Sequence, residues 1–221
     1  MARSNASQRP SVTLVGAMSL DGKISTRTGD SRISSLKDLK VLHKMRCSHD
    51  AVMIGVATLL KDNPRLTVRH VKGKNPIRII VDSAARTPLN ARILRTEPSG
   101  SIIAVTSRAP KERVRRLRQA GTNVIYAGRS QVNLRTLLTR LHKLGIRSIL
   151  LEGGGTLNWS MISDRLVDYI KLTVAPFIIG GSETTTLIDG EGVGKVDHAI
   201  NLTPISITRQ GREIVLVYKV K

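Results

Sequence analysis

The alternation of short apolar runs with amphipathic segments is the feature that most constrains this chain. Apolar runs of roughly four to eight residues between turn residues are typical of buried strands, whereas apolar residues at helical spacing indicate helices. Strands are predicted at residues 11–17, 51–55, 77–82, 101–106, 123–126, 146–151, 167–174, 205–208 and 214–220. Helices are predicted at residues 35–47, 56–62, 110–121, 133–144 and 156–162. This order predicts an α/β fold whose central sheet is mostly parallel, with helices on both faces and an antiparallel C-terminal hairpin.

Polar residues and a glycine mark the ends of two predicted helices. Ser35 and Asn133 can each accept an N–H of the turn that follows, so both are predicted to be N-caps. Gly145 is predicted to close the second of these helices. The inner face of the first helix is predicted to consist of Leu36, Leu39, Leu42 and either Met45 or His43.

The length and composition of the chain fit one domain. With 221 residues and 40% apolar residues, it can bury a single core. Residues 1–10 are predicted to be disordered, and residues 11–221 are predicted to form the domain. No apolar stretch reaches the ~18 residues that span a bilayer, and the N-terminus has no signal-peptide pattern, so a cytoplasmic protein without a membrane partner is expected. A single cysteine, Cys47, and five histidines without ligand spacing give no expectation of a metal.

The strong positive charge allows two interpretations. Thirty-six Lys and Arg oppose sixteen Asp and Glu, which gives a formal net charge of +20. Such a charge can indicate nucleic-acid binding, but the basic residues are spread along the chain, aromatic residues for base stacking are few, and no nucleic-acid-binding motif is found. The densest basic cluster, residues 111–118, is interpreted as the solvated face of a surface helix. We therefore expect a phosphorylated small-molecule substrate rather than nucleic acid.

The stretch LLEGGGTLN, residues 150–158, places three consecutive glycines between a predicted strand and a predicted helix. Glycine permits positive φ and close approach of a ligand to the backbone, and a helix N-terminus offers free N–H groups to an anion. The run is not a Walker A loop, because no Gly-Lys-Ser/Thr follows it. Taken alone, the glycines also fit a tight turn without a ligand.

Small and polar residues follow several of the predicted strands. In a parallel α/β sheet, ligands bind beyond the carboxyl ends of the strands. The residues at these ends include Asp21, Gly22, Lys23, Thr58, Asp62, Arg65 and residues 83–86, 127–129 and 152–155. Hydroxyl groups, glycines and arginines in these positions suit a phosphate-rich ligand, so together they favour a binding site at this edge.

Six motifs, taken together, resemble one known family. They are SLDGKIS (19–25), GDSRIS (29–34), GVATLLKDNPRLTVR (55–69), IRIIVDS (77–83), TPLNARIL (87–94) and SILLEGGGTLN (148–158). Over residues 12–220 the chain is similar to the reductases of riboflavin biosynthesis, which occur fused to a deaminase in bacteria and alone in archaea. The single-domain length is most similar to the archaeal members. The zinc signature of the deaminase requires at least two cysteines, so this chain does not carry it.

The resemblance implies a fold, an activity and a cofactor. The fold would be similar to that of dihydrofolate reductase, the protein a homodimer, and the hydride donor NADPH, with NADH left open. The implied reaction reduces the ribosylamino group of 2,5-diamino-6-ribosylamino-4(3H)-pyrimidinone 5′-phosphate to the ribitylamino product by hydride transfer to ribose C1′. The alternatives are a dihydrofolate- or pteridine-type reductase of the same fold and a basic nucleic-acid-binding protein.

By the same resemblance, individual residues map onto binding positions. The implied cofactor-binding residues are Thr58, Asp62, Ser83, Ala84, Ala85, Arg86, Val132, Gly153, Gly154, Gly155 and Thr156. The implied substrate-binding residues are Ser31, Ser34, Arg46, Leu66, Arg69 and Glu152. Arg46 and Arg69 are expected to clamp the 5′-phosphate, because guanidinium groups bind phosphate bidentately. Arg86 or Arg129 suits a 2′-phosphate of the cofactor. Glu152 is the catalytic candidate, and it would either position the ribose or transfer a proton.

Overall fold

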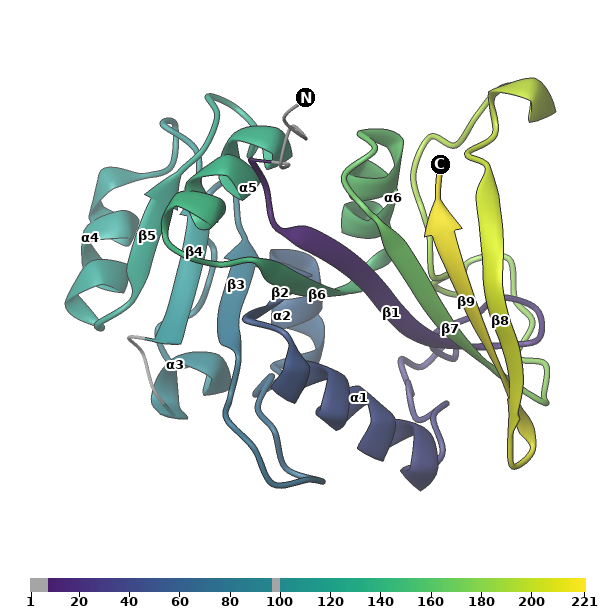
Figure 1. The fold of residues 1–221 in the computed structure, drawn as a ribbon. Helices are drawn as coiled ribbons and strands as arrows, with labels where there is room; N and C mark the ends of the chain where they lie inside the picture. Colours follow the sequence, from purple (N-terminus) through teal and green to yellow (C-terminus); the bar gives the residue numbers. More distant parts are fainter. Residues whose placement is uncertain (1–7, 97–99) are drawn as a thin grey trace, which may run out of the picture.

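The computed structural model describes residues 8–96 and 100–221, and these residues form one nine-stranded sheet with flanking helices (Figure 1). The strands are β1 (Ser11–Ser19), β2 (Ala51–Gly55), β3 (Ile77–Val81), β4 (Ser101–Val105), β5 (Asn123–Tyr126), β6 (Ser148–Gly153), β7 (Tyr169–Ala175), β8 (Leu202–Gln210) and β9 (Glu213–Val220). They lie in the order β5-β4-β3-β2-β6-β1-β7-β9-β8. Only the β7–β9 and β8–β9 pairs within this sheet are antiparallel. The predicted α/β fold, with its mostly parallel sheet and antiparallel C-terminal hairpin, is confirmed.

Helices cover both faces of this sheet. They are α1 (Leu36–Ser48), α2 (Val56–Asp62), α3 (Arg92–Thr96), α4 (Lys111–Gln119), α5 (Leu134–Lys143), α6 (Gly155–Ser163) and a 3-10 turn at Val196–His198. One core contains Met53 and Leu137 under α5 and α6, and a second core contains Ile54 and Leu117 under α2 and α4. Met53 and Ile54 are neighbours on β2, and successive side chains of a strand point to opposite faces, which divides the interior into these two cores. None of the helices in the described ranges is long and apolar enough to cross a membrane.

Two short elements were not predicted from the sequence. The helix α3 has five residues and the 3-10 turn has three. Segments of this length contain hardly more than one turn, so they are too short for a periodic pattern of apolar residues to predict them.

Both predicted N-caps are confirmed. The Ser35 side chain accepts a hydrogen bond from the N–H of Asp38 at 3.2 Å, and the Asn133 side chain accepts one from the N–H of Thr136 at 2.8 Å. Gly145 follows α5 with a φ of +90°. A left-handed residue at this place is the usual way in which glycine closes a helix, as predicted.

The predicted inner face of α1 is wrong for its leucines, whereas His43, given as the alternative to Met45, is buried. Leu36 is 74% exposed, the other leucines of the helix are only partly buried, and its buried side chains are Asp38, His43 and Arg46. These polar side chains can be buried because each one has a hydrogen-bond partner, such as the Thr173 hydroxyl that donates to Asp38 at 2.7 Å. The helix therefore turns a polar face toward the sheet, and this face contributes to the site described below.

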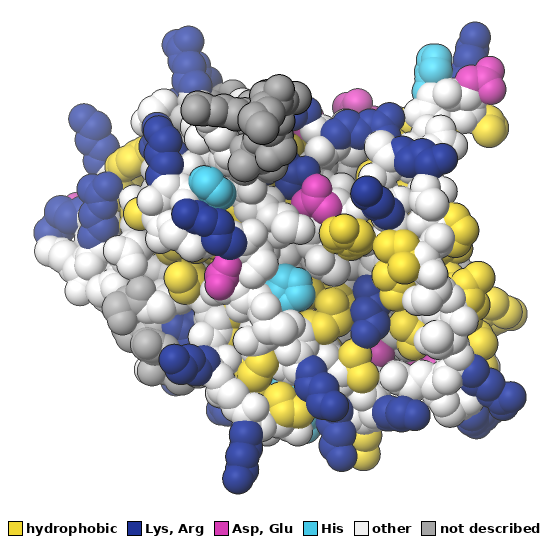
Figure 2. Space-filling view, viewed as in Figure 1, with side chains coloured by type: hydrophobic (Ala, Val, Ile, Leu, Met, Phe, Trp, Pro, Cys, Tyr) yellow, Lys and Arg dark blue, Asp and Glu magenta, His cyan; other side chains and the backbone are white. Residues whose placement is uncertain are grey.

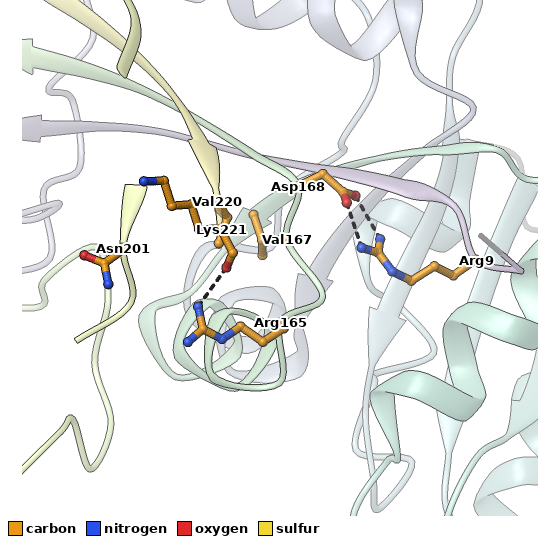
Figure 3. A pocket seen from close by; sticks show the side chains of 7 residues that line it. All are labelled: Arg9, Arg165, Val167, Asp168, Asn201, Val220 and Lys221. Carbon is orange, nitrogen blue, oxygen red and sulfur yellow. Dashed lines mark hydrogen bonds and ion pairs between the residues drawn. The ribbon is translucent and has the colours of Figure 1, made fainter. Parts of the chain in front are cut away.

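A cavity of about 800 Å³ lies at the edge of the sheet where β1 and β7 begin (Figure 3). There, Arg9 forms a bidentate ion pair with Asp168 at 2.7 and 2.8 Å, and Arg165 donates to the backbone carbonyl of Lys221 at 2.8 Å. Residues 1–7 of the N-terminal segment expected to be disordered lie outside the described residues, whereas Arg9 is held by this ion pair. The assignment of residues 11–221 to one domain stays a prediction.

Candidate active site

The carboxyl ends of β2 and β6 meet at the point where the strand order reverses. From β2 the chain adds β3, β4 and β5 in one direction, and it then returns so that β6 lies between β2 and β1. Ligands of open α/β sheets bind in the crevice at such a point. The glycine run begins at Gly153, the last residue of β6, and ends at Gly155, the first residue of α6, so the topology brings it to this crevice.

The glycine turn is held in place by α2. The N–H of Gly154 donates to the Thr58 hydroxyl at 2.8 Å. Gly153 has a φ of +96°, which residues with a side chain rarely adopt, and a Cβ on Gly154 would lie 3.0 Å from the Thr58 Oγ1. Because α6 begins at Gly155, the N–H groups of its first turn have no partner within the helix. The turn thus combines close backbone approach with hydrogen-bond donors.

Asp189 lies against the same turn and was not predicted from the sequence. A Cβ on Gly155 would overlap the Asp189 carboxylate, so a larger residue there would require this side chain to shift. The segment around Asp189 is fixed beside α6, because the Asn158 amide donates to the carbonyl of Leu187 at 2.8 Å. A carboxylate near a helix N-terminus is favourable. A single aspartate in a long loop has no spacing that would single it out in the sequence.

The turn after β3, residues 83–86, is connected to the segment before α5. The N–H of Val132 donates to the Ser83 hydroxyl at 3.1 Å, and the Thr106 hydroxyl donates to the Ser83 carbonyl at 2.8 Å. The structure therefore brings two of the predicted cofactor-binding segments together, although they are far apart in the sequence.

Hydrogen bonds of two further side chains, Asp82 and Arg113, hold the turn at residues 83–86 in place. The fully buried Asp82 carboxylate accepts from the N–H and the hydroxyl of Thr87 at 2.7 and 2.8 Å. Arg113 of α4 donates to the carbonyls of Ala85 and Arg86 at 2.8 and 3.3 Å. The Arg86 side chain stays half-exposed, with its Nε 4.0 Å from Asp82 Oδ1. A rigid turn with an exposed guanidinium is suited to holding an anionic group of a ligand.

Arg46 and Glu152 form a buried bidentate ion pair. Nε and Nη2 of Arg46 donate to the two carboxylate oxygens at 2.7 Å each, and Nη1 donates to the carbonyl of Thr67 at 3.0 Å. The two side chains are only 8% and 12% exposed. Burial lowers the pKa of the Arg46 guanidinium, but the charge of Glu152 and its hydrogen bonds outweigh this effect, and the net pKa is raised. Arg46 is therefore committed to protein partners.

Arg69 belongs to a cluster of guanidinium groups. Burial lowers the pKa of Arg69, the positive charges of Arg46, Arg65 and Arg92 lower it further, and Glu152 raises it. Arginines that repel one another in this way create a positive potential that attracts an anion. Arg65 was noted in the sequence only as a residue after a strand, and Arg92 was not singled out, because each looks like an ordinary surface charge.

His43 fixes the backbone of Arg69. Its Nδ1 accepts the N–H of Arg69 at 2.9 Å, and the side chain is only 1% exposed. Burial, with a further contribution from the charge of Arg46, lowers the pKa of His43 to about 4. The imidazole is therefore neutral near pH 7 and able to accept this hydrogen bond. Leu66, another predicted site residue, lies three residues before Arg69. Its side chain is buried, and its φ of +54° places it at a turn of the backbone.

Three predicted site residues are not joined to this group. Ser31 is exposed and Ser34 half-buried in the loop before α1, and Asp62 is exposed near the end of α2. Within residues 8–96 and 100–221, no side-chain hydrogen bond or ion pair connects them to the other predicted site residues. Desolvation raises the pKa of Asp62, while Lys61 lowers it. Their roles stay predictions.

Two further observations bear on the location and chemistry of the site. The cavity in Figure 3 lies at the opposite ends of the strands from the glycine turn, so it does not include the residues above. In the part of the chain that the structure describes, no group of three or more His, Cys, Asp or Glu residues is placed to hold a metal ion.

The chain is similar to proteins of one enzyme family. The family model of the RibD C-terminal domain matches residues 10–216. The 2,5-diamino-6-ribosylamino-4(3H)-pyrimidinone 5′-phosphate reductase of Methanothermobacter thermautotrophicus is 46% identical over 216 residues, which cover 96% of this chain and 99% of the relative. The reductase of the same name from Aquifex aeolicus is 40% identical over 218 residues, 96% and 97% of the two chains. Among solved structures, Acinetobacter baumannii RibD superposes with a TM-score of 0.84 and 25% identity, over 98% of this chain and 59% of the other.

Proposed function

The chain belongs to the RibD C-terminal domain family of riboflavin-biosynthesis reductases, and from this premise we propose that it reduces 2,5-diamino-6-ribosylamino-4(3H)-pyrimidinone 5′-phosphate to the ribitylamino product. The observation that carries the proposal is the 46% identity, over 96% of the chain, to a reductase of that name. A dihydrofolate- or pteridine-type activity has weaker support, because the arginine cluster around Arg69 suits a phosphorylated substrate.

The turns after β3 and β6 fit a nicotinamide dinucleotide. The N–H groups at the start of α6 suit a pyrophosphate, and the Thr58 hydroxyl keeps the glycine turn before them in place. When bound, the cofactor supplies a hydride to the substrate. We propose NADPH rather than NADH, because the exposed guanidinium of Arg86 is available for a 2′-phosphate. Arg129, exposed after β5, is the second candidate for that contact.

The arginine cluster is proposed to hold the 5′-phosphate of the substrate. Arg69 is exposed and its backbone is fixed by His43, so its guanidinium can meet the phosphate in a defined position. Arg65 and Arg92 add positive charge beside it. Arg46 was expected to clamp the phosphate as well, but its donors already bind Glu152 and the carbonyl of Thr67. It is proposed to orient Glu152 rather than to clamp the phosphate.

Glu152 is proposed to position the reacting sugar. The ring-opened ribosylamine is an imine, and its reduction adds a hydride to C1′ and a proton to the nitrogen. Glu152 is the penultimate residue of β6, beside the glycine turn, and both of its oxygens accept from Arg46. A carboxylate held in this way can still accept hydrogen bonds from ribose hydroxyls, since each oxygen has a second lone pair. Proton transfer from Glu152 would require that one of its oxygens, each of which accepts from the positively charged Arg46, first carry a proton. The positive charge of Arg46 disfavours this protonated form, which supports a positioning role.

We also propose that the protein is a cytoplasmic homodimer. The edge strand β8 exposes Ile205 and Ile207, which are 54% and 65% exposed. Figure 2 shows apolar side chains at the right of the view, over β8 and β9. An exposed apolar edge strand is unfavourable in water and is a common place for pairing with a second copy.

The proposed activity is tested by mixing the protein with NADPH and the ribosylaminopyrimidinone phosphate and following the nicotinamide absorbance. We expect oxidation of one NADPH for each ribitylamino product, slower oxidation of NADH, and a much higher KM for the substrate without its phosphate. Turnover of dihydrofolate without turnover of the ribosylaminopyrimidinone phosphate would overturn the proposal in favour of the pteridine-type alternative.

A further inference from the structure

Half of the net positive charge of the chain is concentrated in one part of the fold. Residues 100–147, which we call the basic lobe, contain eleven Lys and Arg and a single acidic residue, Glu112, against a net charge of +20 for the whole chain. The lobe consists of β4, α4, β5 and α5, at the end of the sheet opposite to β8. In Figure 2 basic side chains project at the left of the view, over α4 and α5. The basic residues are therefore unevenly distributed, and this lobe has a local excess of positive charge.

A groove of about 490 Å³ lies in this lobe between α4 and the edge strand β5. Its lining residues are Lys111, Val114, Arg115, Arg118, Gln119 and Tyr126. The three cations among them are four and three residues apart on α4, so they share one helix face over about 10 Å. The guanidinium carbon of Arg118 lies 5.5 Å from the ring centroid of Tyr126. The groove is thus lined by a row of positive charges and by one aromatic ring, that of Tyr126.

The charge of this row is only partly neutralised. Glu112 is shared by Arg115 and Arg116, at 2.8 and 3.2 Å. No carboxylate of the described residues pairs with Lys111 or Arg118. Glu112 therefore does not neutralise all of the positive charges on this face of α4, and the groove keeps a positive potential toward solvent.

This groove is separate from the candidate active site. β3 and β4 lie between β5 and β2, whose carboxyl end forms the reductase crevice. None of the lining residues takes part in the contacts of Thr58, Gly154, Glu152 or Arg69 described above. The proposed reductase chemistry leaves the groove without a use.

We propose that this groove binds single-stranded RNA as a second function of the protein. Lysine and arginine side chains in a row neutralise successive phosphates, and the Tyr126 ring with the adjacent Arg118 guanidinium offers a surface on which a base can stack. Binding of this kind depends on backbone charge and stacking, so it is independent of base sequence and requires no recognition motif. This explains how a chain without such a motif can carry the surface.

The test measures the anisotropy of a fluorescent oligouridylate of about twelve nucleotides, a length within the usual site size, at several salt concentrations. The groove variant combines Lys111→Gln, Arg115→Gln and Arg118→Gln. The matched control removes the same charge elsewhere with Lys195→Gln, Lys219→Gln and Lys221→Gln, all of them exposed. We expect roughly tenfold weaker binding by the groove variant and a log–log salt slope smaller by about 2, as loss of three contacts to a single strand predicts. The control should bind nearly as well as the unchanged protein.

A third variant, Tyr126→Leu, separates stacking from charge. It should weaken binding about fivefold or more, as loss of one stacked base predicts, and leave the salt slope unchanged. All variants should retain NADPH oxidation with the ribosylaminopyrimidinone phosphate. Equal weakening by the two triple variants would overturn the proposal, because the binding would then be undirected. Binding of poly-glutamate in place of the oligouridylate would also overturn it, and would assign the groove to an acidic protein.

Discussion

At the scale of single residues, the candidate site depends on polar side chains that α1 buries against the sheet. Burying a charge without a partner costs several kcal/mol, so a buried arginine and a buried histidine need fixed partners. Arg46 has Glu152 and the Thr67 carbonyl, and His43 has the N–H of Arg69. These contacts join α1 to the end of β6 and to the segment after α2. The hydrogen bonds of these buried side chains thus fix the positions of Glu152 and of the Arg69 backbone, the groups proposed to bind the substrate.

The ion pair of Arg46 and Glu152 gives the first prediction. Glu152→Gln leaves the buried Arg46 charge uncompensated, and we expect unfolding free energy to fall by about 3 kcal/mol in urea titrations. The double variant Arg46→Met/Glu152→Gln should recover part of this loss, because no charge is left unpaired. For a positioning role, turnover should fall modestly and the pH profile should keep both limbs. An unchanged stability would contradict the buried pair, and a missing limb would contradict the positioning role.

His43 predicts a specific dependence of stability on pH. Its pKa in the folded protein is about 4, below the ordinary value of 6.5, so the unfolded chain binds more protons between these two values. The stabilisation from neutral His43 is complete above pH 6.5 and is lost as the pH falls toward 4. Between pH 7 and pH 5 this group should reduce the unfolding free energy by about 2 kcal/mol.

The measurement for His43 compares urea unfolding at the two pH values in His43→Asn, which keeps an acceptor for the Arg69 N–H but does not titrate. We expect the difference between pH 7 and pH 5 to shrink by about 2 kcal/mol in this variant. The exposed His198→Asn is the control and should leave the difference unchanged. Identical pH dependence in all three proteins would refute the buried, neutral imidazole.

At the scale of elements, the turn from β6 to α6 is the part that most limits which side chains are allowed. Gly154 has an ordinary φ of −70°, so Val is compatible with the backbone there, but its side chain would press on the Thr58 hydroxyl, which is 3.0 Å from the Cβ position. We expect Gly154→Val to fold and to bind NADPH at least about tenfold more weakly, a loss of about 1.4 kcal/mol. Calorimetric titration with NADPH and circular dichroism measure the two properties.

The matched control for this variant is Gly194→Val. A Cβ at Gly194 meets no atom within 4 Å, and its φ is not in the left-handed region. It should therefore bind NADPH as the unchanged protein does. An unaltered affinity of a correctly folded Gly154→Val protein would rule out the glycine turn as a cofactor cradle.

The edge strand β8 gives a prediction about assembly. If Ile207 lies in a dimer interface, Ile207→Lys places a charge there and should shift the mass measured by light scattering toward the 24.1 kDa of one chain. Thr208→Lys is the control, because successive residues of a strand point to opposite faces and Thr208 is also exposed. Monomers for the unchanged protein would contradict the proposed dimer, and dissociation by both variants would contradict this interface.

The elements differ in how far the sequence could predict them. The apolar runs that became β2, β4 and β6 were predictable, because burial on both faces requires continuous hydrophobicity. The polar face of α1 was not, since its partners Glu152, Thr67 and Thr173 come from distant parts of the chain. The position of β6 between β2 and β1 is likewise a property of the assembled sheet. Motif resemblance supplied the names of candidate site residues, but only the fold shows that Arg46 already has partners.

At the scale of the whole molecule, the +20 charge acts on substrate and RNA in different places. Screening reduces interactions between exposed charges beyond about 10 Å at ~0.1 M salt, so distant cations contribute little to either site under such conditions. The arginine cluster around Arg69 and the basic lobe therefore act locally, although both belong to the same strongly basic protein. The two sites should be separable by mutation.

This locality gives the last prediction. Because the substrate phosphate carries about −1.5 to −2 charges near pH 7, kcat/KM should fall about fivefold between ~0.05 and ~0.5 M salt as the arginine cluster is screened. Arg69→Ala should raise the KM by the equivalent of about 2 kcal/mol, remove most of the salt dependence and leave NADPH affinity unchanged. The triple variant at Lys195, Lys219 and Lys221 loses more charge than Arg69→Ala but should keep the salt dependence of the unchanged enzyme. Steady-state kinetics at several salt concentrations decide the matter. If the triple variant lost the dependence and Arg69→Ala kept it, the field of the whole molecule would guide the phosphate, and Arg69 would not be its clamp.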